Sequence, residues 1–138
     1  MQRLKQLIEI YKQNNSVPTL KEILKDFPDL SERTVKQINY LAKMRIKGIQ
    51  DLTDTLVDAS KEEVDSAIMS LWFELRSEWM RYNAVNNYNM VMHGKADDMS
   101  VILSAFISNL IVQLEAMLEK EQIEEMHNIM VKVQYSHA

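Results

Sequence analysis

Glycine and proline are scarce in this chain, which has two of each among 138 residues. These two residue types are the strongest local markers of turns, and folds built from many short strands need turn residues at regular spacing. A chain that can mark so few turns favours a small number of long helices. The sequence therefore predicts an all-α fold.

The stretch 19–48 carries the densest set of helix signals. Thr19 and Glu22 have the spacing of a capping box, which predicts a short helix that the following proline stops. Ser31 is the N-cap candidate of a second helix, expected to end at Gly48 after a cationic last turn. Two helices joined by a tight turn, the second one basic, are typical of a helix-turn-helix that places its second helix in the DNA major groove.

The same stretch resembles the N-terminal winged-helix domain of LexA-type repressors. The resemblance covers residues 4–48: a first helix, a loop with a proline at 16–19, a second helix at 20–27, a recognition helix at 31–44 and a Lys-Gly-Ile exit at 47–49. It implies a DNA-binding head. The chain departs from the family in its turn, which has Pro-Asp in place of a glycine, and in the lack of a clear wing hairpin. Nothing after residue 49 resembles the protease half of those repressors.

Charge is distributed unevenly along the chain. Residues 1–50 hold ten lysines and arginines against five acids, a net charge of +5, while residues 51–138 hold six against fifteen, a net charge of −9. Such asymmetry is what a DNA-binding head on an acidic body would show. The alternative is an ordinary helical protein in which charges scatter unevenly.

The polar face of the predicted recognition helix supplies the candidate DNA contacts. Arg33 and Gln37 lie one turn apart and suit base reading, because arginine pairs with guanine and glutamine with adenine. Lysines further along suit phosphate contacts. The alternative is the solvated face of a bundle helix. The predicted DNA-binding set is Ser31, Arg33, Thr34, Lys36, Gln37, Tyr40, Lys43, Arg45 and Lys47.

Beyond the head, the pattern indicates two long helices. Residues 49–55 favour a further short helix over a poor wing strand. Ser60 begins a second capping box and predicts a helix over 61–92, whose apolar stripe is centred on Trp79. A break at 93–95 precedes another strongly apolar helix, which either continues to about residue 133 or breaks near 121. The predicted domains are a helix-turn-helix head, 1–58, and a helical dimerisation or interaction region, 59–138.

The two long helices would form an antiparallel hairpin with more apolar surface than one partner helix covers. Trp72, Phe73, Ile107, Ile111 and Leu118 would remain in water. The head, a second copy or another protein could cover them. A homodimer forming a four-helix bundle is the economical choice, since its two heads could meet half-sites about one DNA turn apart. A closed monomer is the alternative.

Residues for catalysis are lacking. Without cysteine, and with three scattered histidines, the chain supports no thiolate chemistry, zinc set or catalytic triad, so we expect no enzyme and no cofactor. Glu124 and His127 match the Glu-x-x-His spacing of di-iron bundles, but a second such pair is missing. No apolar run reaches the length of a membrane span, and the N-terminus has no signal-peptide pattern. We expect a cytoplasmic protein.

Two functional hypotheses follow. The first is a small DNA-binding transcriptional regulator that binds double-stranded DNA as a homodimer. The second is a helical adaptor or inhibitor that binds another protein through its basic face or an exposed apolar stripe. A helical metalloprotein, built on Glu124 and His127, is the weakest reading.

Overall fold

The computed structural model of the chain describes residues 18–116 and 118–136. This part forms five helices and no strand: α2 (Pro18–Leu24), α3 (Glu32–Thr55), α4 (Lys61–His93), α5 (Asp98–Glu115) and α6 (Lys120–Ser136). The predicted all-α class is therefore confirmed for the described residues. The first helix of the predicted head, expected before residue 16, lies outside them.

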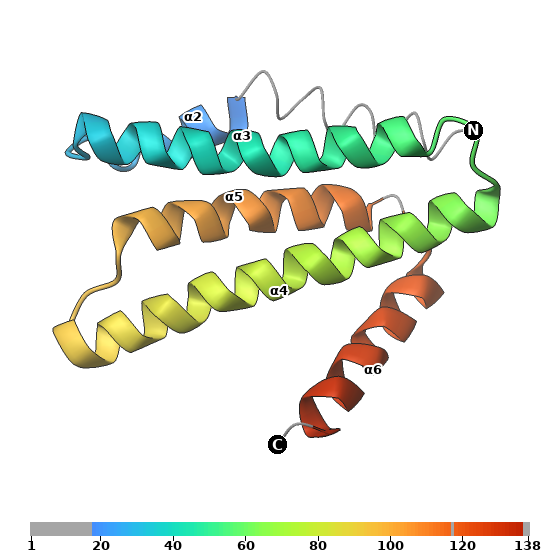
Figure 1. Ribbon diagram of the computed structural model, residues 1–138. Helices are drawn as coiled ribbons and strands as arrows, with labels where there is room; N and C mark the ends of the chain where they lie inside the picture. The colour runs from blue at the N-terminus through green and yellow to red at the C-terminus, as the bar shows by residue number, and fades with distance from the viewer. Residues whose placement is uncertain (1–17, 117, 137–138) are drawn as a thin grey trace.

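The central element is α5. It runs back along α4, and both α2 and α3 pack against it (Figure 1). Nine of its 18 residues are buried, which places apolar side chains on more than one face. This explains why its sequence stripe is wider than one partner requires.

By length and composition alone, α5 is also the one described helix that could cross a membrane. Half of that stretch is buried inside the fold, against the other helices. A core helix with several neighbours needs the same apolar composition as a membrane span.

Local capping chemistry starts α3 and α4 as predicted, and it also starts α5; the capping box predicted at Thr19 is wrong, because Thr19 lies inside α2. The hydroxyls of Ser31 and Ser60 each accept a backbone N–H from three residues further on, at 3.2 Å, and the carboxylate of Asp97 does so at 3.3 Å. The predicted break after α4 occurs at Gly94, whose φ of 72° is the left-handed conformation that glycine adopts without a steric penalty.

The expected end of the second helix at Gly48 is wrong. Helix α3 continues through this glycine to Thr55, so residues 49–55 form neither a separate helix nor a wing strand. A glycine inside a helix costs only about 1 kcal/mol. The buried stripe of α3 runs unbroken across that position, and its packing outweighs the glycine penalty. That stripe consists of Ile38, Ala42, Ile46, Ile49 and Thr53.

The bounds of α2 also differ from the prediction. It begins at Pro18, two residues before Leu20, because a proline fits the first turn of a helix, where its missing N–H is not needed. It ends at Leu24, about one turn before Pro28. The N–H groups of Asp26 and Phe27 each bond a carbonyl three residues back, so the chain tightens out of the helix before the proline is reached.

The apolar surface that motivated a dimer is covered within one chain. Trp72, Ile107, Ile111 and Leu118 are buried, and Phe73 is half-buried. Buried residues from 1–58 and from 59–138 belong to one hydrophobic cluster, so the two predicted domains share a core. The separation into two domains remains an interpretation.

The aromatic centre of the core is Trp72, where the sequence stripe indicated Trp79. Trp72 is fully buried, its indole N–H donates to a Glu115 carboxylate oxygen at 2.8 Å, and the ring of His127 from α6 packs edge-on against it at 5.1 Å. Trp79 is half-buried. Helix α6 thus places His127 against Trp72 and buries Met126 in the same core.

Candidate functional site

Most of the predicted DNA-binding residues form one exposed stripe on the first two thirds of α3. We call it the basic stripe. At 3.6 residues per turn its members fall within roughly one third of the helix circumference. They project away from the buried side of α3, where Ile38 and Ala42 face the core. The basic stripe consists of Arg33, Lys36, Gln37, Tyr40, Lys43 and Lys47, all exposed.

Two predicted contacts, Ser31 and Thr34, are occupied with starting the helix. The Ser31 hydroxyl accepts the backbone N–H of Thr34 at 3.2 Å and lies 2.8 Å from the Thr34 hydroxyl. Ser31 is exposed and Thr34 half-buried. Their observed role is to satisfy the free end of α3 beside the basic stripe.

Within the basic stripe, and among the residues that the structure describes, only Lys36 makes an ion pair, 3.7 Å from Glu32 one turn earlier. Both side chains are largely in solvent, and exposed pairs of this kind contribute about 0–1 kcal/mol. The lysine therefore stays available to an anionic partner.

Arg45 does not belong with these residues. Its guanidinium is 16% exposed and pairs with two carboxylates of α4, Glu74 at 2.9 Å and Glu78 at still closer range. Burial alone would lower the pKa of Arg45, but the hydrogen bonds and charges of the two glutamates outweigh it and hold the pKa above its ordinary value. Arg45 joins α3 to α4 through these carboxylates and is therefore not available as the phosphate contact that the sequence indicated.

Tyr82 lies near the same carboxylates. Burial raises the pKa of its hydroxyl, and the charge of Glu78 raises it further. A hollow of about 430 Å³ between α3 and α4 is lined by Arg45, Leu52 and Glu74, among others. Its two charged groups are already paired with each other, so it offers little to a charged ligand.

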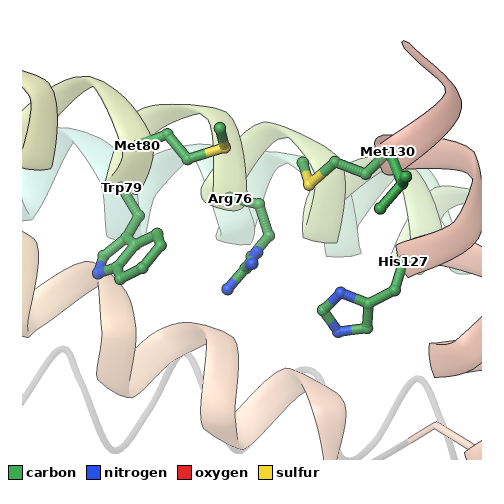
Figure 2. A pocket seen from close by; sticks show the side chains of 6 residues that line it. Arg76, Trp79, Met80, His127 and Met130 are labelled. Atoms are coloured by element: carbon green, nitrogen blue, oxygen red, sulfur yellow. The ribbon is translucent and has the colours of Figure 1, made fainter. Parts of the chain in front are cut away.

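A second candidate site lies between α4 and α6. It is a cavity of about 160 Å³ with one guanidinium, one imidazole and otherwise apolar walls (Figure 2). Its lining residues come from segments about 50 positions apart in the chain. They are Arg76, Trp79, Met80, His127, Met130 and Val131.

The described residues do not support a metal site built on Glu124 and His127. Glu124 is exposed, and His127 packs its ring against Trp72. Across 18–116 and 118–136, no group of three histidine, aspartate or glutamate side chains is arranged to hold a metal ion.

Comparisons with protein families, with curated proteins and with solved structures found no match. The basic stripe, the exposed apolar side chains and the cavity between α4 and α6 are the features of the structure that bear on function.

Proposed function

We propose that the protein is a small DNA-binding regulator that places residues 33–47 of α3 against duplex DNA. The observation that carries this proposal is the basic stripe. Four exposed cations, Arg33, Lys36, Lys43 and Lys47, share one face of a single helix, and no acidic residue lies between positions 33 and 47, although Glu32 just before them pairs with Lys36. A cationic face of this kind is the electrostatic footprint of a nucleic-acid-binding surface.

The order of side chains along the basic stripe suits a recognition helix, in which some residues contact bases and others contact phosphates. Arg33 and Gln37 stand in the first two turns, where such helices contact base edges. Lys43 and Lys47 lie further along and suit phosphates, whose contacts position the protein without reading sequence. Tyr40, exposed to 62%, lies between the two groups and suits either role.

The helix-turn-helix itself is part of the proposal. Residues 25–31 connect α2 to α3, a longer link than the usual turn of 3–4 residues, and α2 packs mainly against α5. The proposal therefore rests on the basic stripe more than on the resemblance to LexA-type heads.

Substitutions in the basic stripe should produce two phenotypes. Arg33→Ala or Gln37→Ala should weaken binding to a preferred site by about 1–3 kcal/mol and relax base choice at one position. Lys43→Ala or Lys47→Ala should weaken binding to all duplexes alike and reduce the slope of log K against log salt by about one unit, because one phosphate contact releases about 0.9 counterion. Mobility shifts at two salt concentrations measure both effects.

The matched control is Lys132→Ala, which removes an exposed lysine of α6 and should leave DNA binding unchanged. If the Arg33 and Gln37 variants bind every duplex as the parent does, α3 does not read bases. If the parent itself shows no salt-dependent binding to any duplex, the regulator proposal fails.

Homodimerisation is proposed on a different surface from the one that the sequence indicated. Beyond Trp79, the exposed side of α4 carries four apolar side chains within about a third of its circumference. We call them the α4 end stripe. Two copies could pair these stripes about a two-fold axis, as in most homodimers. The α4 end stripe consists of Val85, Tyr88, Val91 and Met92, with exposures of 44–83%.

Sedimentation at about 50 μM should show a dimer, because an interface of ~8 kcal/mol has a Kd near 1 μM. Replacing Tyr88 and Val91 together by lysine should give a monomer with an unchanged melting temperature. Val57→Lys, at an exposed apolar position beyond the end of α3, is the matched control and should leave the dimer intact. A parent protein that sediments as a monomer would rule out this interface.

A helical adaptor or inhibitor is the second candidate function, and the α4 end stripe is what favours it. Val91, at 83% exposure, is an unusually open apolar residue for a position inside a helix. A monomer that fails to bind DNA but retains this surface would support protein binding over regulation.

A further inference from the structure

The guanidinium of Arg76 packs against two aromatic rings and has no carboxylate partner among the described residues. Its guanidinium carbon lies 5.6 Å from the ring centroid of Trp72 and 5.0 Å from that of Trp79. The part of the chain that the structure describes supplies it with no hydrogen bond or ion pair, and its Nε is buried with no partner. A buried unpaired donor in a native protein calls for an explanation.

The cavity beside Arg76 supplies that explanation. Figure 2 shows the guanidinium between the rings of Trp79 and His127, with the thioethers of Met80 and Met130 on one side of it. The volume of about 160 Å³ is close to that of an engineered apolar cavity that takes benzene, about 150 Å³. There is thus room for a compact group of a few heavy atoms against the cation.

We propose that the cavity between α4 and α6 binds a small carboxylate with a compact apolar body. The carboxylate would accept hydrogen bonds from the Arg76 guanidinium, the pairing for which arginine is best suited. The apolar body would lie on Trp79, Met80 and Met130, whose flexible thioethers adapt to irregular shapes.

The composition of the walls selects this ligand class. One fixed cation beside apolar side chains complements a single negative charge attached to an apolar group. A phosphate dianion would bring more acceptor oxygens than one guanidinium and one imidazole can satisfy, and unsatisfied buried charge is costly. A neutral apolar molecule would leave Nε of Arg76 unpaired.

A purely structural role for Arg76 would explain only part of these observations. Stacking on two indoles explains the position of the guanidinium. It does not account for the unpartnered Nε or for the adjoining space. Because Arg76 belongs to α4 and His127 to α6, a bound carboxylate would also hold α6 against α4.

The test uses tryptophan emission of the full chain, since Trp72 and Trp79 are its only tryptophans and both flank Arg76. Titration with benzoate and with 3-methylbutanoate should give a saturable change with a Kd of about 0.1–1 mM. Benzamide and 3-methylbutanamide have the same shapes without the charge and should not saturate.

Variants separate the proposed contacts from the fold. Arg76→Gln should lose at least about tenfold in affinity for benzoate, in line with one lost charge-assisted pair. Arg81→Gln, at an exposed arginine five residues further along α4 and outside the cavity lining, should bind as the parent does. Val131→Trp, at a half-open position of the lining, should block the space while Arg76 stays in place.

This inference does not depend on the proposed DNA binding. A parent protein that shows no saturable change with either acid up to about 20 mM, far above the expected Kd, would overturn it. Equal affinity for acids and amides would overturn it too, as would unchanged binding by Arg76→Gln. If Arg76→Gln does not fold by circular dichroism, loss of benzoate binding in folded Val131→Trp carries the test, and retained binding there contradicts the proposal.

Discussion

Replacing Trp72 with alanine is expected to lower the free energy of unfolding by about 3–5 kcal/mol, the range for large buried aromatic side chains. Trp72 has no exposed surface, contacts Phe73 and His127 edge-on, stacks with Arg76, and donates its indole N–H to Glu115. Alanine would leave a cavity and an unpaired carboxylate together. Urea denaturation followed by circular dichroism measures the loss.

Two controls locate the effect. Trp79→Ala should cost only about 1–2 kcal/mol, because a half-buried side chain loses less apolar burial. Trp72→Phe keeps an aromatic ring but removes the N–H, so it should fall between the two alanine variants. A larger loss for Trp79→Ala than for Trp72→Ala would show that the phase of α4 differs from the one described.

Arg45→Ala is expected to destabilise the protein by about 2–3 kcal/mol. Breaking a fully buried ion pair by removing one partner costs about 3–5 kcal/mol. The value here should be lower, because Arg45 and Glu78 retain 16% and 17% exposure. The cost would come mainly from Glu78, which would stay in a largely dry position without its cation. Denaturation in urea, which does not screen charge, gives the difference.

A double-mutant cycle with Glu78→Gln isolates the pair. Glutamine has no charge that would be left buried without a partner, so the double variant should recover part of the stability lost in Arg45→Ala. Lys43→Ala removes an exposed cation from the same helix and should change stability by less than about 0.5 kcal/mol. An Arg45→Ala variant as stable as Lys43→Ala would mean that the ion pairs of Arg45 with Glu74 and Glu78 do not stabilise the fold.

Features set by a few neighbouring residues could be predicted from the sequence. Ser31 and Ser60 start their helices because each hydroxyl meets an N–H three residues away, a contact that needs no other part of the fold. Gly94 ends α4 for an equally local reason, its left-handed backbone. The all-α class followed from the rarity of such breaks.

Features decided by distant contacts could not be predicted in the same way. Gly48 after a cationic turn looked like a helix end, and only the core contacts of Ile46 and Ile49 carry α3 past it. Arg45 looked like one more basic residue of the recognition helix. Its partners on α4 lie about 30 positions away, where no local pattern points to them.

The same difference between local and distant contacts separates the two candidate sites. The basic stripe was predictable because its members share one helix, so their spacing alone places them together. The cavity was not, because its cation comes from α4 and its imidazole from α6. The one hint in the sequence was the Trp72, Arg76, Trp79 spacing, which puts all three on one side of α4.

Because α3 is unbroken, its basic and acidic side chains lie on one rigid helix, with positive charge in its N-terminal part and negative charge near its C-terminal end. Its 24 residues span about 36 Å, at 1.5 Å per residue. On the exposed side, the cations end at Lys47 and exposed Asp51 and Asp54 continue the same line. A polyanion would attract the part up to Lys47 and repel the acidic end beyond it, turning the protein before any contact forms. A rigid helix with this reversal would be steered tip-first toward DNA, because its acidic end would oppose lying flat along the phosphates.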